Sequence, residues 1–367
     1  MKVTHIKINS QVLLKIGWIV PLVLAILIYI LSFFPVIIES YYSSFFYFFI
    51  ADSQRVTFGW LPFSFGDILY TFVIIYILIL LTQCFKCILK KQICWQLFAR
   101  GCLKLIKILL WVYVIFNVSW GLNYNRLGIA HQLNLNETQY STEELKDLTC
   151  DILEKMNESR LALGDSNYQY PTNTLIFQQA FDAYKQTKSS FSFLNYQHFS
   201  VKPSLLSAVV SYAGYSGYYN PFSGEAQLNT DLPKFTMPFV TCHEMAHQLG
   251  YASESEANFV GYLAASNSNN QLFIYSAYFD IFMSANNELF GKDFYAAYLN
   301  LKQVNSLVQN DRKAYRAYLT GKQNNLQPVF SKLYDQYLKA NQQKSGINSY
   351  NEVVGWLINY KKKYGKI

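Results

Sequence analysis

Three long apolar runs dominate the first third of the chain, at residues 13–35, 68–89 and 103–119. A helix needs about 20 predominantly apolar residues to cross the hydrocarbon core of a bilayer. Each run approaches or exceeds that length, so the pattern predicts three transmembrane helices. We therefore assign residues 1–122 to a membrane domain.

Two of these runs have an alternative interpretation. For the first run it is a cleavable signal peptide, but the run is long for one, and the bulky Phe33, Phe34 and Pro35 stand where small residues would mark a cleavage site. For the shorter third run it is a helix lying at the membrane surface. Lys104 and Lys107 at its start can extend toward the headgroups, so a spanning helix remains the preferred interpretation.

Basic residues mark one side of the membrane. They gather before the first run and between the second and third: Lys2, Lys7, Lys15, Lys86, Lys90, Lys91 and Arg100. The stretch from Glu39 to Asp67 instead sets Arg55 against three acidic residues. Because loops rich in lysine and arginine stay in the cytoplasm, we expect a cytoplasmic N-terminus and an extracytoplasmic chain after residue 122. The aromatic stretch from Tyr41 to Phe49 is expected at the outer interface.

Composition agrees with a membrane protein. Hydrophobic residues make up 51% of the chain and charged residues only 15%, whereas soluble domains carry about 25% charge. The net charge of +8 comes from basic residues beside the apolar runs. The lipid bilayer is thus the expected partner of these charges, and nucleic acid is not.

Residues 123–367 are predicted to form one mainly α domain (α+β) with a small sheet. Ser141 and Glu144 form a capping box that opens a helix to about Leu163. Strand-forming residues and turn signals between 204 and 230 predict two or three short strands. Helical spacing is found at residues 175–188, 270–290, 292–303, 307–319, 328–342 and 349–363, with breaks at Gly291, Gly321 and Gly346.

The motif that carries chemistry is His243-Glu244-Met245-Ala246-His247. Pro238 suits a first helical turn and Gly250 suits a helix end, so the motif is predicted on a helix. Residues four apart lie on one face, so His243 and His247 can hold one Zn²⁺ ion. Glu244 would lie beside them, where it can take a proton from zinc-bound water as the catalytic base.

A zinc site of this kind needs a third protein ligand. Ser253 and Glu256 read as a second capping box, which starts another helix just after Gly250. Glu254 then lies in its first turn and is the preferred third ligand, with Glu256 as the alternative. Asn258 is four residues further on the same face and is expected to orient a ligand from behind.

HExxH followed by a helix with E-x-x-A-N resembles the gluzincin metallopeptidases, the group that includes thermolysin. The resemblance implies a zincin-like catalytic domain in which Glu254 is the third ligand and Asn258 supports a histidine. It also implies that a strand before the motif, here Gly224 to Asn229, is an edge strand that pairs with the substrate backbone. An ordinary hairpin is the alternative for that strand.

A closer resemblance extends over nearly the full length. PFSFGDILY, WGLNYNR, GYYNPFSGEAQLNT, the HExxH region and YLKANQQ…SYNEVVGWL resemble a bacterial membrane family known as domain of unknown function 3810. This resemblance implies a multi-pass protein of the bacterial cytoplasmic (inner) membrane. It names no substrate.

The sequence thus predicts a membrane-anchored zinc metallopeptidase that hydrolyses peptide bonds of an envelope peptide or protein outside the cytoplasm. The alternative is a non-catalytic binding or assembly factor with a structural zinc site. Glu244 argues against the alternative, because a structural site needs no base and usually has four protein ligands. Candidate donors to the oxyanion are many, and none is assigned: His131, His198, Tyr215, Tyr218, Tyr219 and Tyr350.

Overall fold

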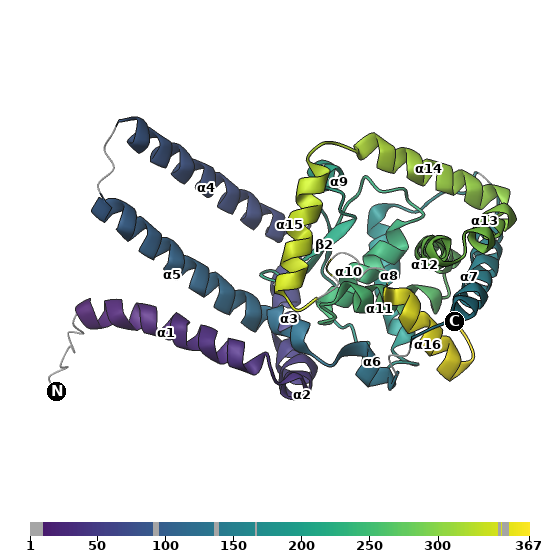
Figure 1. Ribbon diagram of the computed structural model, residues 1–367, viewed down its shortest axis with the longest axis horizontal. Helices are drawn as coiled ribbons and strands as arrows, with labels where there is room; N and C mark the ends of the chain where they lie inside the picture. Colours follow the sequence, from purple (N-terminus) through teal and green to yellow (C-terminus); the bar gives the residue numbers. More distant parts are fainter. Residues whose placement is uncertain (1–9, 91–94, 136–138, 166, 344–345, 347–351) are drawn as a thin grey trace.

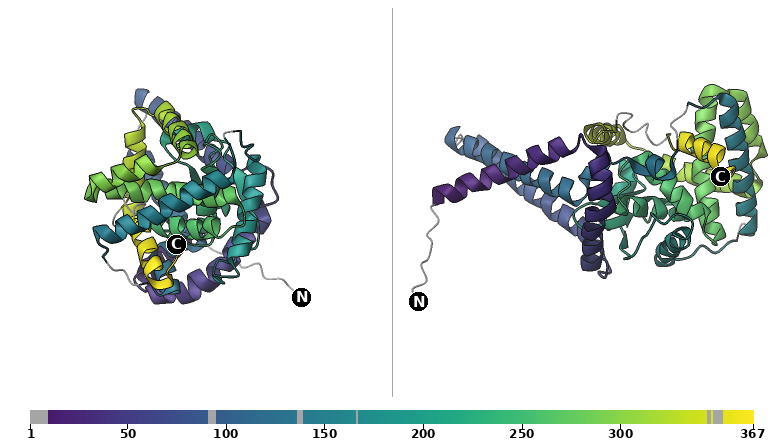
Figure 2. Two further views of the ribbon diagram at one scale, coloured as in Figure 1. Left: turned by 90° about the vertical axis from the view of Figure 1, so that its right-hand side faces the viewer. Right: turned by 90° about the horizontal axis from the view of Figure 1, so that it is seen from below.

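Three long helices extend together from one face of a compact helical body (Figure 1). They are α1 (Ser10–Leu31), α4 (Phe65–Leu89) and α5 (Trp95–Ser119). This arrangement comes from a computed structural model that describes residues 10–90, 95–135, 139–165, 167–343, 346 and 352–367. The right-hand view of Figure 2 shows the same separation from below.

The described residues contain two helices that are long and apolar enough to cross a membrane, within α4 and α5. A third candidate exists if Gly17–Leu31 and Pro35–Phe58, which meet at 101°, count as one broken span. The large apolar side chains of α4 are exposed along most of its length, as lipid contact requires. The protein therefore has two or three candidate membrane helices, and the count of three stays a prediction.

A bent segment crosses the bases of these helices. It consists of α2 (Pro35–Ile37), the π-helix η1 (Ile38–Phe46) and α3 (Tyr47–Phe58). Tyr42 and Tyr47 are buried against the body, whereas Tyr41, Phe45 and Phe49 are exposed. Exposed aromatic side chains at this level suit a membrane–water interface.

The start of α4 is bonded directly to the body. Glu225 accepts hydrogen bonds from the backbone N–H groups of Phe65 and Gly66, at 3.1 and 2.7 Å. Ser64 caps the helix, and Asp67 accepts from the backbone N–H of Leu205 at 2.7 Å. Because the first N–H groups of a helix need acceptors, Glu225 and Ser64 fix where α4 begins, and Asp67 ties its first turn to the body.

The sheet has three short strands, β1 (Val201–Pro203), β2 (Gly217–Asn220) and β3 (Glu225–Leu228). Their order is β1-β3-β2, with β1 parallel and β2 antiparallel to β3. Two predicted strands are thus present. Between β1 and β2, however, residues Ser207–Ala213 form helix α9, which ends at Gly214 with a positive φ of 87°.

The prediction that Gly224 to Asn229 form an edge strand is wrong. This segment contains β3, which is the central strand and has partners on both sides. Its backbone hydrogen-bonding groups are already used, so it cannot add a substrate strand. The edge of the sheet nearer the HExxH motif is β2, where Gly217 lies against the side chain of Glu244.

The remaining helices, the motif helix α10 among them, build the rest of the body. They are η2 (Gly121–Asn125), α6 (Gly128–Leu133), α7 (Thr142–Ala162), α8 (Asn173–Thr187), α10 (Met237–Gln248), α11 (Glu254–Ser266), α12 (Gln271–Lys292), α13 (Phe294–Gln303), α14 (Ser306–Lys322), α15 (Gln327–Ala340) and α16 (Val353–Tyr364). The capping box of Ser141 and Glu144 is present at α7. Two predicted breaks are displaced, because α12 and α14 continue through Gly291 and Gly321. Within the predicted helix 349–363, residues 349–351 lie outside the described chain.

Candidate metal site

The HExxH helix α10 lies in the interior, between the sheet and helices α8, α11 and α12 (Figure 1). Pro238 stands in its first turn, where the missing N–H costs no hydrogen bond. Its chemistry-bearing side chains are almost fully enclosed: His243, Glu244 and His247 are 8%, 4% and 5% exposed. Such burial removes water from around the charged groups and strengthens their interactions.

A tight turn after α10 brings the third candidate ligand back to the histidines. Gly250 has a φ of +86°, and a side chain there would press on the ring of Tyr47 at 2.9 Å. Helix α11 then begins at Glu254, whose carboxylate faces His243 and His247. The predicted group His243, His247 and Glu254 is therefore assembled in the structure, with its donor atoms within 4.8 Å of one another.

The donor atoms form a nearly equilateral triangle. The Nε2 atoms of His243 and His247 are 3.2 Å apart, and Glu254 Oε2 lies 3.3 and 3.6 Å from them. Tetrahedral zinc with bonds of about 2.0–2.2 Å places its donors about 3.3–3.6 Å apart. The residues thus fit one face of a tetrahedral metal site and leave the fourth position for another group.

The second nitrogen of His247 is also held. Its Nδ1 lies 2.7 Å from the backbone carbonyl oxygen of Tyr251, which requires the proton to be on Nδ1. In the neutral ring, Nε2 then carries a lone pair directed at the other ligands. This is the arrangement in which a histidine binds a metal.

Side chains at the bases of the candidate membrane helices hold the end of α10. The indole N–H of Trp120, just after α5, donates to the carbonyl of His247 at 3.0 Å. The Tyr47 hydroxyl donates to the carbonyl of Gln248 at 2.9 Å. The His247 carbonyl also accepts from the backbone N–H of Gly250 at 3.0 Å. Carbonyls at a helix end have no partner within the helix, so the two side-chain donors add to this turn and hold the last turn of α10.

Three polar atoms of the site lack a hydrogen-bond partner within the described chain: His243 Nδ1, Glu244 Oε2 and Glu254 Oε2. Leaving buried polar groups unpaired costs about 1–3 kcal/mol each, and more for charged groups. A metal ion would satisfy the free oxygen of Glu254. The free oxygen of Glu244, which is outside the donor triangle, is available to a reactant.

The electrostatics favour a cation between the ligands. Burial opposes the charge on Glu254, but the neighbouring histidines outweigh it and hold its pKa well below the usual range. Burial likewise opposes protonation of His247, yet Glu254 raises the pKa of that histidine to about 9. Burial raises the pKa of Glu244 to about 7, the range that suits a group exchanging protons at neutral pH.

The predicted capping box at α11 is wrong. Ser253 is the N-cap, but its hydroxyl pairs with that of Ser255 at 2.9 Å and makes no capping bond. Glu256 turns away from the histidines and accepts from the backbone N–H of Ile129 at 2.8 Å. Glu256 is therefore occupied in tying α6 to α11, while Glu254 alone of the two faces the ligands.

Asn258 is buried on α11, one turn beyond Glu254. The hydrogen bonds of the described residues include none between Asn258 and a ligand histidine, and His247 uses the Tyr251 carbonyl instead. The role of Asn258 stays a prediction.

Asp280 of α12 is an acidic residue near the site that the sequence pattern does not single out. Burial raises its pKa to about 6, and the opposing influence comes from His243.

Tyr334 is the main residue that the sequence did not single out. It lies on α15, and its hydroxyl donates to Glu254 Oε1 at 2.5 Å. No local motif marks it, since α15 carries other tyrosines and belongs to the last part of the chain. Only the packing of α15 across the site selects it.

The other proposed donors lie elsewhere. Tyr218 and Tyr219 bond to Asp67 and Tyr47, away from the ligands. Tyr215 makes a ring contact with Tyr334, and His198 lies near Asp52. His131 is exposed, and Tyr350 lies outside the described residues. Tyr215 is linked to the site through Tyr334, whose hydroxyl bonds to Glu254.

The fold and site define a class: a helical protein with candidate membrane helices and a buried two-histidine, one-glutamate group that could hold a metal ion. The chain belongs to the family described as "Protein of unknown function (DUF3810)", which matches residues 42–358. The match includes α4, α5 and the candidate site in one unit. Comparison with curated proteins and with solved structures gave no match.

Proposed function

We propose that the protein is a membrane-anchored zinc-dependent peptidase that hydrolyses peptide bonds outside the cytoplasm. The observation that carries the proposal is the position of Glu244. Its carboxylate is buried beside a triangle of donors that fits tetrahedral zinc, and one of its oxygens has no hydrogen-bond partner among the described residues.

His243, His247 and Glu254 would hold the ion. Zinc bound there supplies a Lewis acid that polarises a peptide carbonyl and makes a water molecule more acidic. Manganese and other divalent ions accept the same donor types, but three-coordinate N,N,O sites with an open position are typical of catalytic zinc.

Glu244 is suited to move the proton. Its free Oε2 can accept a proton from the attacking water and then release it to the nitrogen of the leaving amine. A pKa near 7 lets the same carboxyl group accept and donate at neutral pH. Glu254 instead stays ionised at neutral pH, since its pKa is held well below the usual range. The two carboxylates therefore take different roles, one as base and one as ligand.

The experiment compares two variants of the full-length protein in detergent or vesicles. Glu244→Gln should retain bound zinc and lose hydrolysis of a responsive peptide by at least about 100-fold, the lower value for general acid–base catalysis. His243→Ala should lose both zinc and activity. A binding or assembly factor would give another pattern: Glu244→Gln would complement a deletion strain fully, and His243→Ala would not.

A further inference from the structure

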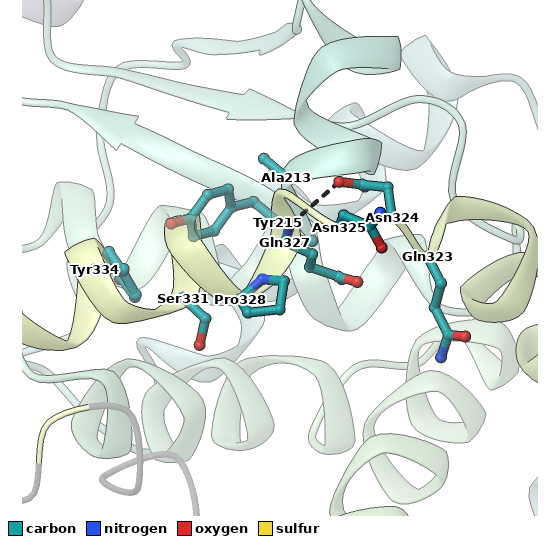
Figure 3. A pocket seen from close by; sticks show the side chains of 10 residues that line it. Ala213, Tyr215, Gln323, Asn324, Asn325, Gln327, Pro328, Ser331 and Tyr334 are labelled. Atoms are coloured by element: carbon teal, nitrogen blue, oxygen red, sulfur yellow. Dashed lines mark hydrogen bonds between the residues drawn. The ribbon is translucent and has the colours of Figure 1, made fainter.

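A cavity of about 690 Å³ lies between α9 and α15 (Figure 3). Gly214 and Tyr215 line one side, and Gln327 and Tyr334 line the other. Tyr334 also bonds to Glu254, and its ring lies 5.3 Å from that of Tyr215. The cavity therefore reaches Tyr334, the residue that bonds to the candidate ligand Glu254.

Large apolar side chains are exposed on or just before the two helices that enclose this cavity. We call six of them the apolar rim: Leu205, Val209, Leu326, Val329, Phe330 and Leu333, between 38% and 63% exposed. Soluble surfaces seldom gather so many large apolar groups, and such a patch usually marks a binding surface.

Helix α15 carries side chains of a different kind on each of its faces. Leu326, Val329, Phe330 and Leu333 follow the three- and four-residue spacing of one helical face. A second face, with Tyr334 and the buried Leu338, covers the site, and the basic Lys332 and Lys339 lie on a third. An exposed apolar face flanked by lysines is typical of a helix lying in a membrane surface.

The apolar rim lies at the level where the candidate membrane helices begin. Asp67, in the first turn of α4, accepts a hydrogen bond from the backbone of Leu205 at 2.7 Å. The hydroxyl of Tyr124, shortly after α5, donates to that of Tyr337 on α15 at 3.3 Å. Figures 1 and 2 both place α15 on the face from which α4 and α5 extend.

We infer that the apolar rim inserts into the membrane leaflet nearer the body, so that the cavity opens at the bilayer surface. Exposed aromatic side chains are also found on η1 and α3, the segment that crosses the bases of the long helices (Figure 1). This inference deepens the proposed function and rests on it for the substrate: the scissile bond belongs to a polypeptide anchored in the same membrane.

The insertion can be tested without any enzymatic assay. An environment-sensitive fluorescent amino acid is placed at Val329, at Leu333 or, as the matched control on the same helix, at Lys332. The full-length protein is reconstituted in vesicles of phosphatidylcholine and phosphatidylglycerol with or without brominated acyl chains. Brominated lipid should quench the probes at 329 and 333 by at least about twofold more than the probe at 332, because quenching requires contact with the acyl region.

Two results would overturn the insertion. Aqueous iodide quenching all three probes equally would place the apolar rim in water. Shielding of the 329 and 333 probes from both iodide and brominated lipid would indicate a protein occupant, such as a second copy of the chain.

The substrate class is tested with one peptide in two forms, free and attached to a lipid anchor in the same vesicles. The parent should cleave the anchored form at least about tenfold faster than the free form at equal bulk concentration, because anchoring raises its effective concentration. Leu333→Glu should reduce this preference and leave cleavage of the free peptide unchanged. Equal rates for both forms would reject the substrate class. Cleavage of neither form would count against the peptidase function, and the fluorescence result would still decide the insertion.

Discussion

The Tyr334 hydroxyl donates to Glu254 Oε1 at 2.5 Å, and the two residues come from helices 80 positions apart in the chain. The bond leaves Glu254 Oε2 to face the histidines. Tyr334 thus fixes which oxygen of the carboxylate is presented to a metal, as partners behind metal ligands commonly do.

Tyr334→Phe removes this bond and retains the ring. Loss of such a partner typically costs about 10- to 100-fold in metal affinity, so zinc should bind more weakly by that factor. Titration with a competing chelator measures it in the full-length protein. The control is Tyr337→Phe, on the same helix, whose hydroxyl is bonded to that of Tyr124 instead. Equal weakening in both variants would mean that α15 contributes only general packing.

Glu254→Gln and Glu256→Gln should separate the two acidic residues of α11. Glu254→Gln should lose zinc, because it removes the charged donor. Glu256→Gln should keep zinc and lower the free energy of unfolding by no more than about 1–3 kcal/mol, since its bond to Ile129 N–H is weakened. Metal analysis and thermal unfolding give both values. Zinc loss in the Glu256 variant alone would exchange the assignments.

Gly217→Ala should displace the carboxylate of Glu244 and leave the three candidate metal ligands in place. A Cβ atom there would lie 2.6 Å from Glu244 Oε1, so the carboxylate would have to move. We expect hydrolysis to fall by at least about tenfold, because small displacements of catalytic groups are costly, while zinc content stays unchanged. Gly291→Ala is the control, since its added Cβ would meet open space. Full activity of the Gly217 variant would show that Glu244 has room to adjust.

Reporter fusions test the sidedness. The basic loop between the second and third apolar runs predicts that a reporter active only outside the cytoplasm is inactive when fused after Lys90 and active after Arg126. Activity after Lys90 and silence after Arg126 would place the candidate site in the cytoplasm.

The helical framework and the grouping of the three candidate ligands could be predicted because each depends on a local pattern. The spacing of His243 and His247 requires only a helix, and Glu254 requires only a turn at Gly250. The sequence supplied a mistaken reason for preferring Glu254, since no capping box forms and Glu256 is occupied by the backbone of Ile129.

The errors concern contacts between distant segments. The resemblance to gluzincins implies an edge position for β3, but strand order depends on the pairing of β1, which begins at Val201, well before Glu225, and adds in parallel. Helix α9 was missed because Val209 and Val210 resemble strand residues. Tyr334 could not be selected, because nothing within α15 indicates which tyrosine reaches another helix.

The hydrogen bond from Trp120 to the carbonyl of His247 has a consequence for biogenesis. The HExxH helix is translated more than 100 residues after the segment that closes its last turn, so the site is completed only when α5 and the helix bases are already in position. A soluble fragment released by cleavage just after Trp120 would leave the His247 and Gln248 carbonyls without these two side-chain donors. We therefore expect shedding of the body from the membrane to inactivate it, which would confine the activity to the cell surface.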